Sequence, residues 1–313
     1  MSLVLAVFAA LAATAGALRP QRLSRARAPP RPITFVTIKD DFFGTNLARS
    51  QLWIDRAQEP HEWMVIENTE NRNISSVYAE AKERAQHDLV VFLHDDVFLP
   101  EGFYADMMQR LAALEAHDPN WGVAGAVGIV GKDQAVIQNI QDSYGTRRDF
   151  NTERSLEAAF AFDELLLVLR KSSSVNFDPQ LPGFDLYGLD IVQQTHAQNL
   201  TAYVLPVYVQ HKVHDPEGAM YDEDMHWSKI LTDAYADRVN ITAEYLVNKW
   251  CDKGMRCSIG TFFILSCRTR ALTLRNVLPL SAESIANSTK WAKSLYKQVD
   301  LDQCLADNGL VVP

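Results

Sequence analysis

The sequence has fewer basic than acidic residues, no visible internal repeat and no long apolar run. Each of these features argues against some class of protein. Lysine and arginine number 30 against 39 aspartates and glutamates, which gives a formal net charge of -9. This balance argues against nucleic acid or an anionic membrane surface as the main partner. No repeat is visible along the 313 residues, of which 47% are hydrophobic and 22% charged. Such a chain is predicted to fold as one large globular domain with an appendage.

Cysteine is scarce, and Cys251, Cys257, Cys267 and Cys304 all lie in the last quarter of the chain. They form no close CxxC pair, so a zinc site is less favoured than disulfides. An even number of cysteines suits two disulfides in an oxidising compartment, although four cysteines allow three pairings. A short loop favours Cys251 with Cys257, which leaves Cys267 with Cys304. We therefore expect residues 251–313 to form a disulfide-bearing appendage.

The apolar segment at residues 3–13 is too short to span a bilayer comfortably. It is followed by the A-x-A cleavage signature Ala15-Gly16-Ala17, so residues 1–17 are predicted to be a signal peptide. No basic residue precedes the segment and arginines follow it, so a short membrane anchor or a two-part plastid-targeting leader stays open. Membrane association is expected only if the segment is uncleaved. The Pro- and Arg-rich residues 18–32 are predicted to be a linker.

Four N-x-[ST] sequons agree with entry into the secretory pathway. They lie at Asn73, Asn199, Asn240 and Asn287. Together with the signal peptide and the cysteines, they predict a glycoprotein in the lumen of the ER or Golgi or outside the cell, with a plastid less favoured.

Three apolar runs that we interpret as strands end in polar side chains. They lie within residues 33–41, 63–68 and 89–100, with helical stretches between them. This alternation predicts an α/β fold whose parallel sheet has right-handed crossovers. The carboxyl ends of parallel strands share one edge, where ligands bind. The polar side chains expected at this nucleotide-sized crevice are Lys39, Glu67, Asn68, His94, Asp95 and Asp96.

Asp95 and Asp96 are adjacent carboxylates that follow His94 at the end of a strand predicted to be buried. Two such carboxylates repel each other unless a cation lies between them. A hard divalent metal ion with a diphosphate is the simplest occupant. Alternatively, both are turn and cap residues before a helix that opens near Pro100.

Further elements follow from periodicity. The helix after residue 74 should be capped by Ser75 or Ser76. Residues 123–131 and 161–170 are each predicted to be one strand, and the polar residues 132–157 between them have no assigned role. The helix before them has an apolar stripe expected in the core, made of Phe103, Met107, Leu111 and Leu114.

Two later residues have both a structural and a chemical interpretation. A helix is expected to begin near Asp190, which would form a capping box with Gln193. A carboxylate at a helix N-terminus that faces the crevice could instead act as a general base. His211 ends a strand interrupted by Pro206, and is either a surface histidine or a metal ligand.

The order of these parts resembles the glycosyltransferase family 2-like enzymes of the GT-A fold, and more narrowly the branch with a StrF-type domain, named for a streptomycin-biosynthesis protein. The resemblance covers about residues 33–250, and the tail from Cys251 lies outside it. It rests on four segments in the right order: IENTENRNISSVYAEA, VVFLHDDVFLP, FDLYGLDIVQQTHAQNLTAYVLPVYVQHK and EYLVNKW.

The resemblance implies a DxD-type metal site. Asp96 takes the last position of that element and is the expected metal ligand, with Asp95 beside it. His94 stands where many relatives have the first aspartate, a ribose or metal contact, so this chain departs from the pattern there. His211 matches the late histidine that completes the metal shell. An imidazole beside a carboxylate favours Mn²⁺ over Mg²⁺.

The resemblance also implies roles away from the metal. Asp190 matches the general base of inverting relatives. If Asp190 proves to be only a helix cap, Asp185 is the next residue to consider as the base. Glu67 takes the place of the acidic residue that contacts the nucleotide base. Ala79 stands where relatives often carry asparagine, so the donor contacts of that helix differ.

Together these features predict a metal-dependent, inverting hexosyltransferase. It would move a sugar from a nucleotide-sugar donor, a UDP-sugar first of all, to a hydroxyl of a glycan, lipid or protein acceptor. A secreted, catalytically inactive transferase-like or carbohydrate-binding module is the alternative, since sequons and cysteines suit that class as well.

Overall fold

The computed structural model describes residues 31–131, 135–141, 147–212, 214, 233–253, 255, 257–259, 263–267 and 271–274. Contacts divide the chain into two units, Met1–Arg31 and Pro32–Pro313, and the description below concerns the second. The predicted signal peptide and nearly all of the predicted linker lie outside the described residues. None of the helices in the described ranges combines the length and apolar character needed to cross a membrane.

The central sheet has six strands in the order β11-β5-β10-β3-β1-β2. Their bounds are β1 Ile33–Ile38, β2 Glu62–Ile66, β3 Leu89–Leu93, β5 Val123–Gly125, β10 Leu166–Arg170 and β11 Ala202–Val204. Parallel pairs join β1 to β2 and β3, and β5 to β11, whereas β10 runs antiparallel between β3 and β5. The prediction of an α/β fold with a mostly parallel sheet is confirmed.

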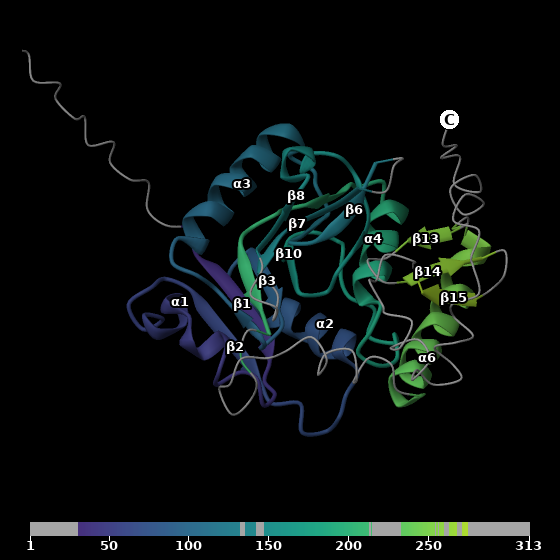
Figure 1. Ribbon diagram of the computed structural model, residues 1–313, viewed down its shortest axis with the longest axis horizontal. Helices are drawn as coiled ribbons and strands as arrows, with labels where there is room; N and C mark the ends of the chain where they lie inside the picture. Colours follow the sequence, from purple (N-terminus) through teal and green to yellow (C-terminus); the bar gives the residue numbers. More distant parts are fainter. Residues whose placement is uncertain are drawn as a thin grey trace, which may run out of the picture. The chain divides into compact units, whose positions relative to one another are not determined.

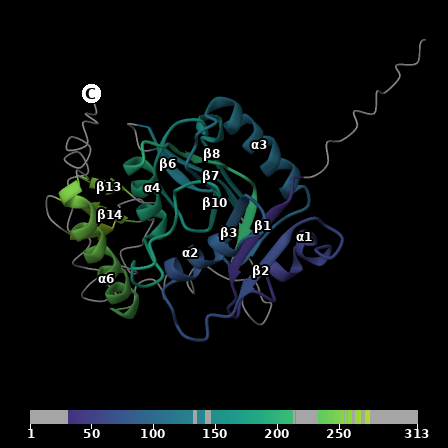
Figure 2. The same ribbon diagram turned by 180° about the vertical axis from the view of Figure 1, so that it is seen from behind.

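Helices cover both faces of this sheet (Figures 1 and 2). Side chains alternate between the faces, so that Val90 of β3 belongs to one buried cluster and its neighbour Val91 to the other. One cluster includes residues of α2 Ile74–Arg84, α4 Tyr187–Ala197 and α6 Asp233–Trp250, and the other includes residues of α3 Phe103–His117. Burial on both sides explains why β3 is a continuous apolar run.

The helices agree only in part with their sequence-based prediction. The four buried residues of α3 are those of the predicted stripe, which is confirmed. The predicted serine cap of α2 is wrong, because the helix begins at Ile74 after Asn73 and Ser75 is buried in its first turn. The remaining helical turns are η1 Leu47–Arg49, α1 Gln51–Ile54, η2 Thr152–Arg154 and η3 Cys251–Lys253.

A second sheet has the order β4-β12-β7-β6-β9, with β8 paired to β7. Its strands are β4 Val97–Phe98, β6 Gly128–Val130, β7 Ala135–Gln141, β8 Arg147–Phe150, β9 Ala159–Phe162 and β12 Val209–His211. The stretch at residues 132–157, which had no assigned role, thus contributes β7 and β8, which pair antiparallel.

Two predicted strands are wrong in their extent, because each splits between the two sheets. Residues 123–131 form β5 and β6, and residues 161–170 contain the end of β9 and all of β10. Asp163 and Glu164 stand at the second break. A third crossing, from β11 to β12, contains Pro206, which lacks the N–H that a sheet ladder needs. The apolar pattern continues from β5 into β6 because both strands are buried.

The region after α6 has three antiparallel strands, β13 Cys257–Ile259, β14 Phe263–Ser266 and β15 Ala271–Leu274. A disulfide joins Cys251 to Cys267 with a Cα–Cα distance of 5.3 Å. The predicted pairing of Cys251 with Cys257 is therefore wrong, and so is that of Cys267 with Cys304, which lies outside the described residues. The short loop was a poor guide because β13 and β14 carry the chain back and bring position 267 to the end of α6.

Candidate metal centre

The carboxyl ends of β1, β2 and β3 meet at one edge of the central sheet, as predicted. The Asp95 carboxylate, after β3, accepts a hydrogen bond of 2.6 Å from the backbone N–H of Asp40, after β1. The Lys39 ammonium donates to the Glu67 carboxylate, after β2, at 2.9 Å. The parallel register of the three strands produces this convergence.

His211 reaches the same edge from the second sheet. It is the last residue of β12, which pairs antiparallel with β4 and sets His211 opposite Val97. The backbone N–H of Lys212 donates to the Asp96 carbonyl at 2.9 Å, which continues the pairing by one residue. Two residues 115 positions apart in sequence, Asp96 and His211, thus become neighbours through strand pairing.

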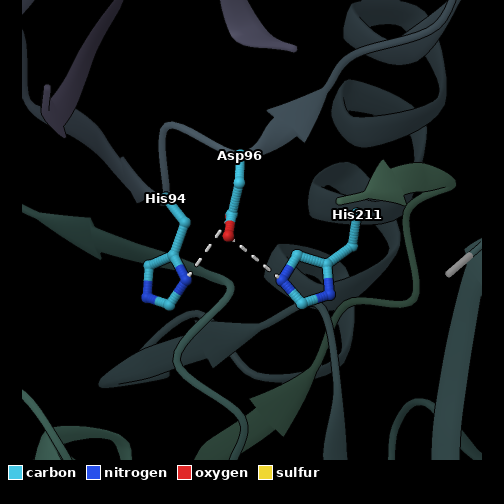
Figure 3. Close-up of side chains that lie close together, drawn as sticks. All are labelled: His94, Asp96 and His211. Carbon is cyan, nitrogen blue, oxygen red and sulfur yellow. Dashed lines mark ion pairs between the residues drawn. The ribbon is translucent and has the colours of Figure 1, made fainter. Parts of the chain in front are cut away.

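The Asp96 carboxylate lies between two imidazoles (Figure 3). His94 Nδ1 is 3.8 Å from Asp96 Oδ1, and His211 Nε2 is 3.6 Å from Asp96 Oδ2. One donor atom from each of the three residues lies within 4.8 Å of the others. The Lys212 ammonium is 3.5 Å from Asp96 Oδ2. The group combines one carboxylate and two imidazoles with a neighbouring lysine.

The protonation of this group suits metal binding. Burial alone would raise the pKa of Asp96, but His211, Lys212 and His94 lower it well below its ordinary value. Burial lowers the pKa of His94, although Asp96 opposes that change, and so favours the neutral imidazole, which has a free lone pair. The site therefore offers an ionised carboxylate and an imidazole lone pair, which are the forms that bind a cation.

Asp95 differs from its neighbour. Burial, followed by the charge of Asp96, raises the pKa of Asp95 to about 7, although the N–H of Asp40 stabilises the ionised form. A cation nearby would favour ionisation of Asp95 as well.

The residues fit a divalent metal ion. Asp96 Oδ1 is buried and, among the described residues, no hydrogen-bond donor reaches it. A buried carboxylate oxygen in this state is costly unless a cation occupies the space beside it. Two imidazoles with a carboxylate suit Mn²⁺ or another transition metal better than Ca²⁺.

The predicted nucleotide contacts lie at the exposed rim. Hydrogen bonding to Lys39 lowers the pKa of the exposed Glu67. The Asn68 side chain is engaged by its own loop, because its amide donates to the Arg72 carbonyl at 2.7 Å and its oxygen accepts from the Arg72 N–H. Of these three, Lys39 and Glu67 form a pair and Asn68 shapes the loop.

The Asp190 carboxylate is held by side chains of α6 and of its own helix, α4. Asp190 is 1% exposed and accepts hydrogen bonds from the Lys249 ammonium at 2.8 Å and from the Trp250 indole N–H at 2.7 Å. The Gln194 amide donates to its second oxygen at 2.8 Å. Burial raises its pKa, and Lys249 opposes that rise.

The predicted capping box at Asp190 is wrong, because α4 begins at Tyr187 with Leu186 as its N-cap residue. The Glu164 carboxylate, from the β9–β10 connection, accepts the backbone N–H of Gly188 at 3.1 Å. Glu164 thus acts as the side-chain cap of α4, because it accepts a hydrogen bond from a backbone N–H of the first turn. A cap supplied by a residue 24 positions away leaves no local sequence pattern.

Sequence reasoning missed three residues beside the site, namely Tyr187, Glu164 and Lys212. The acidic pair Asp163-Glu164 inside an apolar run was the one signal for Glu164, since a buried strand accommodates such a pair poorly. Burial, with Asp163 and Asp185 nearby, raises the pKa of Glu164 well above its ordinary value. Tyr187 gave no signal of its own, because only the fold brings it to His94. Lys212 follows His211 directly in the chain, but only the pairing of β4 with β12 brings its ammonium to Asp96.

No family model matches the chain. Among curated proteins, it is 28% identical over 215 residues to ATP synthase subunits region ORF 6 of Fuscovulum blasticum, an alignment that covers 62% of this chain and 84% of that protein. That name states no enzymatic activity, and the narrower StrF-type label stays a prediction.

Several solved structures are similar at low scores. The mannosyltransferase PcManGT from Pyrobaculum calidifontis, in complex with GDP-Man and Mn²⁺, matches at 14% identity and a TM-score of 0.40 over 72% of this chain, which spans 64% of that enzyme. TarS of S. aureus in complex with UDP-GlcNAc matches at 11% and 0.38, over 70% of this chain and 72% of that one. GalNAc-T7 with UDP, GalNAc and Mn²⁺ matches at 10% and 0.37, over 64% and 47%. Glycosyltransferases are thus among the similar structures, but scores of this size leave the functional argument to the site itself.

Proposed function

We propose that the protein is a glycosyltransferase that moves a sugar from a nucleotide-diphosphate donor to an acceptor hydroxyl. The observation that carries the proposal is the group of His94, Asp96 and His211 at the carboxyl edge of parallel strands. That edge is where α/β sheets bind ligands. A diphosphate leaving group needs its charge neutralised there, and the resemblance of four sequence segments to family 2-like transferases supports the same reaction.

Asp96, His94 and His211 would hold Mn²⁺, or Mg²⁺ in its place. When bound, the ion would act as a Lewis acid that stabilises the charge developing on the leaving diphosphate. Lys212, whose ammonium lies 3.5 Å from Asp96, would contribute a second positive charge to the same phosphates. Asp95, buried against the backbone of Asp40, would keep the loop between the two strand ends in place.

The rim would bind the nucleoside part of the donor. Lys39 and Glu67 are exposed and paired beside the metal-binding loop, and Asn68 fixes the turn that follows. A UDP-sugar is the first donor to test. Transfer of a hexosyl group, with inversion, forms part of this proposal.

The general base is proposed to be Asp190, with one condition. Both of its oxygens are held by α6 and by Gln194, so an acceptor hydroxyl would reach it only after the Lys249 contact opens. Glu164 is the second candidate, because it is less buried than Asp190. Burial also raises the pKa of its carboxyl group above the ordinary value, and a carboxylate with a raised pKa is a stronger base. Asp185, held by two hydrogen bonds from Arg238 at 2.6 and 3.1 Å, is the third.

Location and acceptor belong to the proposal as well. The lumen of the ER or Golgi, or the outside of the cell, agrees with the sequence features and with the disulfide between Cys251 and Cys267. The acceptor would be a glycan, a lipid or a protein. A secreted carbohydrate-binding module is the competing function, and it would have no need of an ionised carboxylate between two imidazoles.

The decisive experiment is titration of the protein with UDP, with and without Mn²⁺. We expect UDP to bind only with the ion, and Asp96→Asn to abolish that binding with the fold intact. Asp106→Asn is a matched control, since it removes a carboxylate that pairs with Arg110 on the surface of α3. A screen of nucleotide sugars by thermal shift then identifies the donor, because a ligand at 100 Kd stabilises by about 2.7 kcal/mol.

The same titration separates the two functions. UDP binding that is unchanged in Asp96→Asn would remove Asp96 from the proposed role. If the wild-type protein binds glycans but binds neither UDP nor Mn²⁺, and hydrolyses no nucleotide sugar, it is the binding module instead.

A further inference from the structure

Tyr187 connects the metal centre to the start of α4. It is the first residue of that helix and is 1% exposed. Its hydroxyl lies 2.9 Å from His94 Nε2 and donates to the backbone carbonyl of Glu164 at 3.1 Å. A buried hydroxyl that touches a candidate metal ligand and a fixed carbonyl constrains where the protons lie.

Counting protons assigns the tautomer of His94. A tyrosine hydroxyl has one proton, and the Glu164 carbonyl can only accept. The arrangement that satisfies both contacts has Tyr187 donate to the carbonyl and accept from His94 Nε2–H. The neutral imidazole then has its lone pair on Nδ1, the nitrogen that faces Asp96 at 3.8 Å (Figure 3).

The Tyr187 ring is buried among other aromatic rings. It packs against Tyr78 and Phe177, with ring centroids 5.8 and 6.0 Å away. The Glu164 side chain binds the N–H of Gly188, one residue further on, at 3.1 Å. The residue before it, Leu186, has a φ of 62°, a conformation rare for leucine that the surrounding packing must maintain.

We propose that Tyr187 is a positioning residue that fixes the ring orientation and the Nε2–H tautomer of His94, so that Nδ1 is presented to a divalent cation. This inference rests on the metal site of the proposed function. Partners of this kind orient metal-binding histidines in other proteins, and losing one typically weakens metal binding about 10- to 100-fold.

The first test is calorimetric titration of Tyr187→Phe with Mn²⁺ alone. We expect Mn²⁺ to bind about 10- to 100-fold more weakly than to the wild type. Tyr203→Phe is the matched control: Tyr203 is 6% exposed, its hydroxyl donates to Asp118 beyond the end of α3, and its loss should leave Mn²⁺ affinity unchanged. Equal affinity in wild type and Tyr187→Phe would overturn the inference while leaving the metal site standing. A wild type that binds no Mn²⁺ would overturn both.

The second test reads the tautomer directly and needs no metal and no variant of Tyr187. A two-bond ¹H–¹⁵N correlation spectrum of the metal-free wild type, with His94 assigned by comparison with His94→Gln, reports which nitrogen has the proton. We expect Nε2–H for His94. A proton on Nδ1 would sink the inference even if Tyr187→Phe failed to fold.

Discussion

Replacing Lys249 with methionine should strongly destabilise the protein. The Lys249 ammonium donates to Asp190 at 2.8 Å and to Asp178 at 2.6 Å, and so lies between two carboxylates. The Asp190 side chain is 2% exposed and that of Lys249 is 16% exposed. Lys249→Met keeps most of the volume and removes the charge that compensates both carboxylates.

The size of the effect follows from burial. Removing one partner of a buried ion pair typically costs about 3 to 5 kcal/mol, because the remaining charge is left without compensation. The Trp250 indole and the Gln194 amide still donate to Asp190, which favours the lower half of that range. Lys253→Met is the control: Lys253 is an exposed lysine above the same Trp250 ring, and its loss should change stability by about 0.5 kcal/mol or less.

The loss should depend on pH. Burial already raises the pKa of Asp190 above that of the unfolded chain, and removing Lys249 raises it further. Between the unfolded and folded pKa values, the folded variant binds a proton that the unfolded chain lacks, so its stability falls as pH rises. We therefore expect Lys249→Met to be more destabilising at pH 8 than at pH 5.

Urea unfolding followed by tryptophan fluorescence measures these differences. The double variant Asp190→Asn/Lys249→Met should be more stable than Lys249→Met, since the buried charge is gone, and the coupling should fall within about 0.5 to 3 kcal/mol. A loss below about 1 kcal/mol that is equal at pH 5 and pH 8 would refute the reasoning.

Asp190→Asn alone then distinguishes the two roles of this carboxylate. If Asp190 is the base, transfer should fall by about 10² or more with donor affinity unchanged. If it only joins α4 to α6, stability should fall while the folded variant transfers at a near-normal rate. The search for a base would then turn to Glu164.

Two further predictions concern other parts of the fold. Replacing Cys251 and Cys267 with serine should cost about 3 kcal/mol for a loop of this length, and peptide mapping without reduction should recover the two cysteines joined; free thiols in the native protein would contradict the structure. Gly188→Ala should destabilise by about 1 to 3 kcal/mol, because its Cβ would stand 2.8 Å from the Phe162 carbonyl and 3.2 Å from the Glu164 side chain. If Gly188→Ala instead stabilised the protein, as a glycine-to-alanine change does in an exposed helix, the atoms around position 188 would have to move to make room for the added Cβ.

The sequence was informative wherever a local pattern determines structure. The apolar run of β3 with polar residues after it predicted the sheet edge, and the spacing of Met107 and Leu111 predicted the buried face of α3. Asp96 and His211 were selected as metal ligands, and strand pairing brings them together. The family resemblance was needed for His211, because a histidine at a strand end has no distinctive pattern.

The features that the sequence did not predict depend on contacts between residues far apart in the chain. The crossing from β5 to β6 interrupts an apolar run that has no local sign of a break. The other two crossings are marked only by Pro206 and by the pair Asp163-Glu164. The start of α4 was misplaced because Glu164 caps it from another element. The disulfide was mispaired because loop length is a weak guide once strands fold the chain back on itself.

The candidate metal centre lies where the chain passes from β3 of the central sheet to β4 of the second sheet. His94 follows the last residue of β3 in the central sheet, whereas Asp96 precedes β4 and His211 ends β12 in the second sheet. An ion bound by all three residues would link the central sheet to the second sheet. Part of its binding free energy would then stabilise the contact between the two sheets, so that loss of the ion should lower the free energy of unfolding.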